Sequence, residues 1–353
     1  MIRVSADILQ RFLAKVFVKA GLPKKDAATV ADHLMFCNLR GVDSHGVTRV
    51  PDYLKRLKDG GTNARPKVKA IQNRSSAVLL DGDNGMGQVA GLCAADLAVR
   101  KAKKTGMCVV GVRGSSHYGA ASYYSLRIAG SDMIGFSTTN VNPVMAAWGG
   151  SSRAIGNNPL SIAVPGPLNK SVVLDISMSI VAGGKIKLAK DGGQKIPKGW
   201  ILDSRGRDSE DPGDFFKGGS LFPFGAHKGY GLAFMLEMLA GVLTGAAILD
   251  EIPIWFKETA APVNIGHLFG AVDIGRFAGA DFFKDRLHGM AAELKGRTLE
   301  GQAGAVCLPG EVEEKIESER RQNGVPLGEE LWDELMKISA SFGEPLRAAG
   351  GRG

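Results

Sequence analysis

The segment from Ala77 to Gly114 constrains the fold more than any other part of the chain. Two aliphatic runs, AVLLDG and MCVVGVRG, enclose GQVAGLCAADLAVRKAKKTG, whose length and composition predict a helix between two strands. Further strand-like runs follow, separated by Gly, Asn and Pro: IGFSTT, LSIAVPG, SVVLDIS and HLFGAVDI. This order of elements predicts an α/β fold.

The two ends of the chain are predicted to be helical. In a first helix, apolar residues recur every three or four positions, at Leu9, Phe12, Leu13, Val16 and Phe17. A second helix is expected from about Lys25 to Leu39, and two more follow Pro309-Gly310. We therefore expect a helical unit of residues 1–75 that packs with C-terminal helices in 310–353, a small strand-helix-strand unit of 76–122, and a larger unit of 123–309.

The composition excludes several classes of function. The 353 residues are 44% hydrophobic and 23% charged, with a net charge of +8, as in an ordinary soluble protein. Lys and Arg are scattered without interleaved aromatics, so we predict no nucleic-acid site, although a basic surface attracts small anions. The four cysteines form no C-x-x-C pair, which is typical of reduced thiols in a cytoplasmic protein, and no metal motif is present. The apolar stretch 231–249 carries Glu237 near its centre, which favours a buried core helix over a membrane span.

A glycine-rich pattern follows the first of the two enclosing strands. Gly85-x-Gly87-x-x-Ala90 matches the dinucleotide fingerprint, and Arg113 ends the second strand, where an NADP-binding protein can place an arginine. The glycines lie several residues past the apolar run, however. We therefore interpret them as a structural entry to the helix and do not predict a Rossmann fold from them.

Asp43, Ser44 and His45 stand side by side in GVDSHGVTRV. Because neighbouring side chains diverge on strands and helices, we do not expect them to form a Ser-His-Asp relay, and the chain has no G-x-S-x-G elbow. A histidine in a polar loop is a suitable proton carrier near neutral pH, and Arg49, four residues on, can grip a carboxylate with its two-pronged guanidinium. The alternative is a capping serine with an incidental histidine.

A second histidine stands in a similar context. In GVRGSSHYGAASYY, His117 follows directly on a strand, at the place where α/β proteins put ligand sites. Of the other four histidines, His33 lies in mid-helix and His288 in a charged segment, so we expect both at the surface. His267 precedes an apolar run.

Two further segments have the character of anion sites. FGAHKGYG places His227 and Lys228 at the start of the long apolar helix, where free N–H groups and the helix dipole favour a pyrophosphate. VVLDISMSIVAGGKIKLAK gives a strand ending at Asp175 and Ser177, suited to a ribose hydroxyl and a phosphate, and then Lys185 at a helix start. Helix caps and solvated lysines remain the alternative for both segments.

Taken together, these segments resemble the type 2 malate/L-lactate dehydrogenase family, which includes ureidoglycolate, sulfolactate and diketogulonate dehydrogenases and reductases of cyclic imino acids such as piperideine-2-carboxylate. The matching segments keep the family's order and span nearly the whole chain: RGVDSHGVTRVPDY, VRGSSHYGAASYYS, TTNVNPVMAAWGG, AIGNNPLSIAVP, LDISMSIVAGGKIKLAKDGGQKIPKGWILD, LFPFGAHKGYGLAFMLEMLAGVLTGA, HLFGAVDI and LPGE. The resemblance implies a non-Rossmann dinucleotide-binding domain with a mixed, largely antiparallel sheet, in a protein that works as a homodimer.

The resemblance also implies the site. A histidine, His117 in preference to His45, exchanges the substrate proton, Arg49 holds the carboxylate of a small-molecule substrate, and Ser44 hydrogen-bonds substrate or cofactor. NAD or NADP is expected along a longer set: Asn140, Asp175, Ile176, Ser177, Met178, Ser179, Lys185, His227, Lys228, Pro309, Gly310 and Glu311. Departures such as Ala147 for proline and Asn157 for threonine concern the identity of the substrate.

Three hypotheses follow. The first is an NAD(P)-dependent 2-hydroxy-acid dehydrogenase, and the second is a reductase of cyclic imino acids, which needs the same carboxylate grip and histidine. The third is a dinucleotide-binding protein without catalysis, against which the retention of both histidines and Arg49 argues. The sequence leaves NAD against NADP open.

Overall fold

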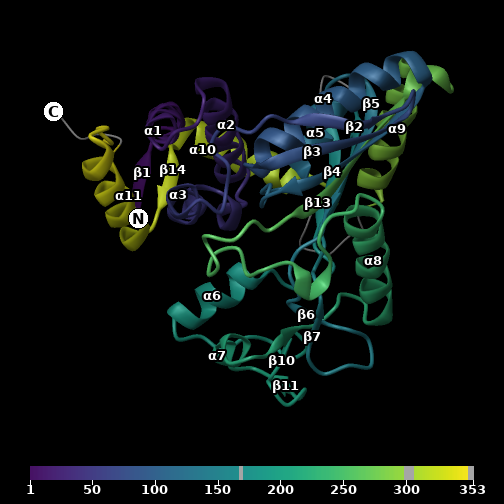
Figure 1. Cartoon of the computed structure of the whole chain (residues 1–353). Coiled ribbons are helices and arrows are strands. Elements are labelled where there is room, and N and C mark those ends of the chain that lie inside the picture. The colour runs from purple at the N-terminus through teal and green to yellow at the C-terminus, as the bar shows by residue number, and fades with distance from the viewer. Residues whose placement is uncertain (167–169, 298–305, 349–353) are drawn as a thin grey trace.

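The computed structural model describes residues 1–166, 170–297 and 306–348 and is built around a seven-stranded sheet (Figure 1). In spatial order its strands are β2 (Lys69–Asn73), β3 (Ala77–Gly85), β4 (Met107–Ser115), β13 (Ile265–Asp273), β5 (Met133–Thr139), β8 (Leu160–Pro165) and β9 (Ser171–Ile176). The β3–β4 pair is parallel, and every other neighbouring pair in this sheet is antiparallel. The predicted mixed, largely antiparallel sheet is therefore confirmed.

Two helices cover one face of this sheet. They are α4 (Gly87–Thr105) and α5 (Ser122–Ala129). Alanines at four-residue spacing form the buried face of α4, and their small side chains let the helix lie close to the strands: Ala90, Ala94, Ala98 and Ala102. Because β3, α4 and β4 share this core with β5 and β13, the sheet crosses the predicted boundary between residues 122 and 123.

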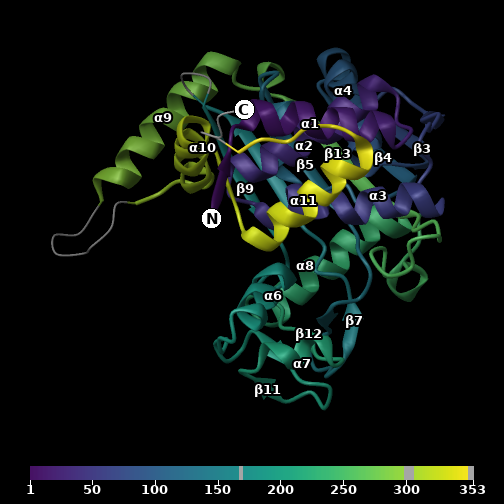
Figure 2. The ribbon, with the colours of Figure 1, turned by 90° about the vertical axis from the view of Figure 1, so that its left-hand side faces the viewer.

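Helices from the two ends of the chain pack together. They are α1 (Ala6–Lys19), α2 (Lys24–Leu39), α3 (Val50–Asp59), α10 (Glu311–Asn323) and α11 (Glu329–Phe342). The short strand β1 (Ile2–Val4) pairs antiparallel with β14 (Val325–Leu327), which ties the N-terminus to the C-terminal segment. Figure 2 shows α11 lying across this group of helices. Each of the apolar residues expected to line α1 is buried.

A second, smaller sheet lies below the seven-stranded one in Figures 1 and 2. Its strands, in spatial order, are β11 (Asp208–Ser209), β10 (Ile201–Leu202), β12 (Ser220–Leu221), β6 (Met145–Ala146) and β7 (Arg153–Ile155). The helices α6 (Gly183–Asp191) and α7 (Pro212–Phe216) pack together with it. The segment that follows β9 leads through α6 into this small sheet.

The apolar stretch 231–249 is a helix that stops early. α8 (His227–Glu237) continues as one π-helical turn, Met238–Val242. Farther along the chain, α9 (Ala280–Gly296) follows β13. Glu237 is buried, and its carboxylate accepts hydrogen bonds from Asn140, Asn158 and the Leu249 backbone N–H at 2.8–3.2 Å. A buried acidic side chain with this many donors has its hydrogen-bonding needs met within the protein. In the part of the chain that the structure describes, no helix has the length and apolar character to cross a membrane.

Candidate active site

The loop between α2 and α3 is held in place from both sides. It contains two 3-10 turns, Asp43–His45 and Val47–Arg49. Asn38 donates to the Asp43 carboxylate at 2.7 Å and accepts from the Val47 N–H at 2.8 Å, while Arg320 of α10 grips Asp43 with both terminal nitrogens at 2.6 and 2.9 Å. A side chain at Gly46 would lie 2.3 Å from the Asn38 amide oxygen, so the loop requires glycine there. The histidine of this loop therefore projects from a rigid support.

Within the loop, the Ser44 hydroxyl lies 2.9 Å from Nδ1 of His45. The expectation that these adjacent side chains diverge was wrong, because it assumed strand or helix geometry and the segment is a 3-10 turn. The Asp43 carboxylate is engaged by Arg320 and Asn38. The three residues consequently form no Ser-His-Asp relay, as expected.

The two histidines with SH-G contexts come together in space. The rings of His45 and His117 are stacked, with centroids 5.5 Å apart and planes inclined by 22°. His117 stacks more closely on Trp255, at 4.6 Å and 10°. Both histidine side chains are partly buried. Residues 72 positions apart in sequence thus form one compact pair, which is suited to proton transfer at a single bound group.

The His117 ring is oriented by Tyr53. The Tyr53 hydroxyl lies 2.8 Å from Nδ1 of His117, and it accepts a hydrogen bond from the Gln88 amide at 2.9 Å. Because Gln88 uses the oxygen of Tyr53 as acceptor, the phenolic proton is directed to Nδ1. Neutral His117 then carries its own proton on Nε2, where it can donate a hydrogen bond to a substrate oxygen.

The glycine-rich pattern at residues 85–90 serves this arrangement. A side chain at Gly87, the first residue of α4, would lie 2.2 Å from the Ser116 carbonyl oxygen and 2.7 Å from the backbone of His117. Glycine allows the N-terminus of α4 to touch the His117 loop and to place Gln88 beside Tyr53. Its role in the described structure is close packing, as we interpreted it from the sequence.

His33 holds the same loop from the other side. Its Nε2 accepts a hydrogen bond from the Ala120 N–H at 3.0 Å, and a side chain at Gly119 would lie 1.9 Å from its ring. The prediction of a surface position was wrong for His33, which is fully buried, because the aromatic residues of α5 cover this face of α2. His288 is exposed, as predicted, and His267 is buried in β13 between the Thr139 and Ser115 hydroxyls.

Arg49 belongs to the same loop as His45 and contacts the same indole as His117. Its Nε donates to the Ser44 carbonyl at 2.7 Å, one terminal nitrogen pairs with Asp52 at 3.3 Å, and its guanidinium carbon lies 5.5 Å from the Trp255 ring centroid. The side chain is partly exposed, so a ligand can reach the fork. Arg49, Ser44, His45 and His117, which the sequence predicted as one site, therefore lie together.

The electrostatics keep both histidines neutral. Burial, and then the positive charge of Arg49, lower the pKa of His45 to about 3. Burial also lowers the pKa of His117 well below its usual value, with His45 and Arg49 acting in the same direction. Burial raises the pKa of Asp52 although Arg49 opposes the shift. Before substrate binds, the pair is therefore uncharged at neutral pH.

The predicted cofactor segments at the end of β9 and before α10 are neighbours. The Val173 N–H bonds the Pro309 carbonyl at 3.1 Å, and a side chain at Gly310 would lie 2.6 Å from Val173. Asp175 accepts from the Ser122 N–H at 2.9 Å, just after the His117 loop. Glu311 accepts from the Leu308 N–H and pairs with Lys295, which lowers its pKa. These segments therefore adjoin the histidine loop.

The next part of the segment leads to α6. Ser177 is partly exposed, whereas Ser179 is buried and bonds Val181, Met178 is buried in the core of the small sheet, and Ile176 packs against that core. A side chain at Gly184 would lie 3.0 Å from Cβ of Ser44, so the N-terminus of α6, with exposed Lys185, abuts the Ser44 loop. Lys185 thus lies close to the catalytic candidates.

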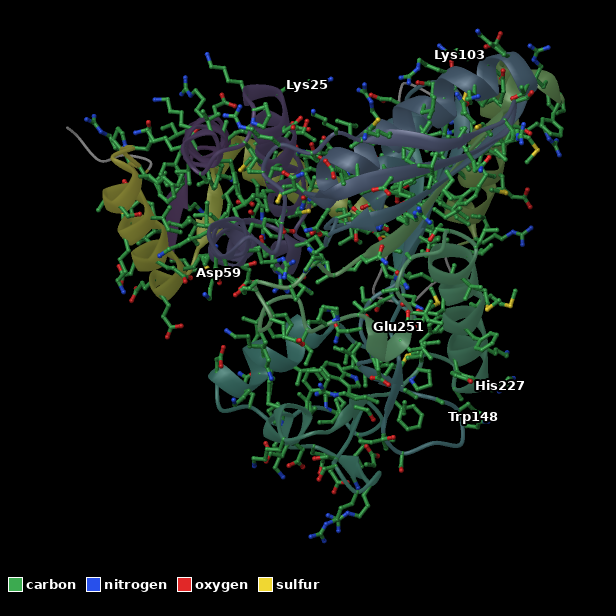
Figure 3. The ribbon with its side chains drawn as sticks, viewed as in Figure 1. Lys25, Asp59, Lys103, Trp148, His227 and Glu251 are labelled. Carbon is green, nitrogen blue, oxygen red and sulfur yellow. The ribbon has the colours of Figure 1, made fainter. Side chains whose placement is uncertain are left out.

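Three of the predicted cofactor residues have surroundings unlike those of the segments just described. His227 and Lys228 are exposed at the start of α8, and Figure 3 shows His227 beside Trp148, far from Asp59 at the end of α3. Asn140 is fully buried, and its amide bonds Glu237, the Ala247 carbonyl and the Gly266 N–H. A cofactor role for these three residues stays a prediction, and for Asn140 the described contacts are structural.

Sequence reasoning missed Tyr53, Gln88 and Trp255. Tyr53 had a signal, because it lies one helical turn after Arg49 on the same face of α3. Gln88 and Trp255 come from a helix start and a loop, and no local pattern marks them. Among the described residues, no group of His, Cys, Asp or Glu side chains is arranged to hold a metal ion.

Comparison with known proteins gives a consistent result. The sequence model of a family described as Malate/L-lactate dehydrogenase matches residues 4–336. A malate dehydrogenase of Pyrococcus abyssi is 37% identical over 349 residues, covering 97% of this chain and 95% of the relative. An L-sulfolactate dehydrogenase of Methanocaldococcus jannaschii is 36% identical over 337 residues, covering 95% of each chain. The crystal structure of a malate dehydrogenase from Entamoeba histolytica superposes with a TM-score of 0.93 at 31% identity, covering 98% of this chain and 99% of the other.

Proposed function

The chain belongs to the malate/L-lactate dehydrogenase family, and on that premise we propose that it is a cytoplasmic NAD(P)-dependent dehydrogenase that interconverts a small 2-hydroxy acid and its 2-oxo acid. The main support for this proposal is the arrangement of the two histidines and Arg49. The rings of His45 and His117 are stacked at 5.5 Å beside Arg49, so a proton carrier and a carboxylate grip share one site.

The proposed mechanism assigns a task to each side chain. Arg49 binds the substrate carboxylate with its fork and so fixes the neighbouring carbon, while Ser44 holds His45. Bound nicotinamide coenzyme supplies or accepts the hydride. In reduction, His117 protonated on both nitrogens donates the Nε2 proton to the carbonyl oxygen and keeps the proton on Nδ1 beside the Tyr53 oxygen, and in oxidation the neutral ring takes the substrate proton back on Nε2. The carboxylate offsets the charge of Arg49, which lets the pair hold an additional proton while substrate is bound.

The residues around the histidine loop fit such a coenzyme. The end of β9, the Pro309–Glu311 segment and the N-terminus of α6 adjoin the catalytic candidates and offer hydroxyl groups, backbone N–H groups and Lys185. On the same helix, Lys187 pairs with Asp191, and the Lys190 ammonium lies over the Phe216 ring. We expect either NADH or NADPH to bind along these segments.

The test is coenzyme oxidation by the wild-type protein with a panel of 2-oxo acids, each with and without methylamine. NADH and NADPH are run in parallel. Turnover with the 2-oxo acids alone supports the dehydrogenase, and turnover that requires the amine supports the imino-acid reductase instead. Coenzyme binding without turnover on any acceptor contradicts both enzymes and favours the binding protein.

We also propose that the working form is a homodimer. Large apolar side chains are exposed along α8 and the turn that follows: Leu232, Phe234, Met235, Leu239, Val242 and Leu243. Met235 and Leu243 are 56% and 63% exposed, and Figure 1 shows α8 at the outer edge of the molecule. An apolar stripe of this kind on a chain of ordinary composition favours a self-complementary contact with a second copy.

Light scattering on the purified protein tests the dimer. We expect a wild-type dimer, a shift to monomer in Leu243→Glu, and an unchanged dimer in Met336→Glu, a control on an exposed residue of α11. A wild-type monomer at micromolar concentration would contradict the proposal.

A further inference from the structure

The Trp255 indole contacts both His117 and Arg49. It stacks on His117 at 4.6 Å with planes inclined by 10°, and lies 5.9 Å from the Tyr53 ring that bonds His117. The guanidinium of Arg49 lies 5.5 Å from its centroid. Although it belongs to a loop, Trp255 is only 6% exposed. One planar group thus contacts both the proton carrier and the carboxylate grip.

The loop that carries Trp255 is fixed by a buried arginine. Arg56 of α3 is 2% exposed, which is rare for this residue type. Its guanidinium donates to four backbone carbonyls and one hydroxyl: those of Gly61, Trp255, Glu258 and Ala261, and Thr62 Oγ1. Three of the carbonyls belong to residues 255–261. Because α3 also carries Tyr53, Arg56 joins the Trp255 loop to the helix that orients His117.

We propose that Trp255 is a positioning residue of this site: the indole fixes the His117 ring and the Arg49 guanidinium relative to each other, and Arg56 fixes the indole. This inference rests on the proposed function and adds a residue that takes part through its neighbours. Parallel stacking restricts rotation of the imidazole plane, and the cation–π contact restricts the guanidinium. A small misplacement of either group costs much of the rate, because the transferred proton and the carboxylate must be aligned together.

The stack also shields His117 from water. Without the indole, the His117 ring gains solvent, and its pKa moves up toward the ordinary histidine value. A loss of positioning should therefore change the pH profile of kcat/KM as well as kcat. A loop with a purely structural role would lower stability and leave the profile in place.

The experiment compares Trp255→Leu, Trp255→Phe and the control Trp332→Phe, which replaces a partly buried tryptophan of the helical unit. We expect Trp255→Leu to lower kcat about 10- to 100-fold on the 2-oxo acid that the wild type prefers, with coenzyme binding unchanged. Its kcat/KM profile should shift to a higher midpoint pH. Trp255→Phe, which keeps a stacking ring, should stay within about threefold of wild type, as should Trp332→Phe.

The outcomes separate the two proposals. If Trp255→Leu keeps wild-type kcat and pH profile, or if Trp255→Phe loses as much as Trp255→Leu, the positioning role is wrong while the dehydrogenase stands. If the wild type turns over no acceptor, the proposed function fails, and this inference fails with it. Should Trp255→Leu not fold, Arg56→Lys provides the second variant: a lysine cannot reach four carbonyls, so kcat should fall and the profile should shift in the same direction.

Discussion

The hydroxyl of Tyr53 offers the sharpest single-atom test of how His117 is set up. Tyr53→Phe removes a bond of 2.8 Å to His117 Nδ1 and a bond of 2.9 Å from Gln88, with almost no change in volume. Gln88 is fully buried and cannot regain the lost partner from water. The variant should therefore lose about 1–3 kcal/mol of unfolding free energy, the usual cost of an orphaned buried group.

The effect on catalysis should be larger than on binding. Without the phenolic proton, the His117 ring is free to adopt either tautomer and to rotate, so we expect kcat to fall about 10- to 100-fold, or about 1.4–2.7 kcal/mol. KM should change by less than about threefold, because Arg49 still holds the carboxylate. Steady-state coenzyme oxidation and urea unfolding measure the two effects.

Tyr123→Phe is the matched control. Its hydroxyl bonds Asp32 at 2.6 Å, outside the site, and its removal should leave kcat unchanged. A Tyr53→Phe enzyme with kcat within twofold of wild type would refute the orienting role. Equal losses in both variants would show that any tyrosine hydroxyl in this region matters only for stability.

Two further predictions address the carboxylate grip and the buried histidines. Arg49→Lys keeps the positive charge but loses the two-pronged guanidinium that reaches Ser44 and Asp52. KM for the 2-oxo acid should therefore rise about 10- to 100-fold, with a smaller change in kcat. An unchanged KM would show that the substrate carboxylate binds elsewhere. Burial lowers the pKa of His33 and His267 to about 3, below the value of about 6.5 in the unfolded chain. Between these values the unfolded state binds more protons, so stability should fall as pH falls, by about 2 kcal/mol per histidine at pH 5, and urea unfolding of His33→Gln should show a smaller loss between pH 7 and pH 5 than wild type.

Much of the fold could be predicted from local patterns in the sequence. The strand-helix-strand segment and the apolar spacing in α1 depend on neighbouring residues, and both appear as predicted. The antiparallel character of the sheet does not follow from any local pattern. It entered through the resemblance, because strand pairing joins residues such as His267 and Thr139 that are far apart in the chain.

The residues of the site also differ in whether the local sequence could reveal them. Ser44, His45 and Arg49 lie within six residues, so their proximity could be predicted, and His117 was found through its similar context. His33 was misplaced because helical periodicity does not reveal that Tyr123 and Tyr124 cover the outer face of α2. Trp255 could not be found, since its position depends on the carbonyl contacts of Arg56 and not on its own segment.

The role of His117 is tested most directly by comparing His117→Ala with His45→Ala in coenzyme oxidation on the preferred 2-oxo acid, with coenzyme binding measured separately. We expect His117→Ala to lose about 10²–10⁴ in kcat with coenzyme affinity intact, while His45→Ala loses less. Full activity in His117→Ala, with the loss in His45→Ala instead, would contradict the assignment of His117 as the proton carrier.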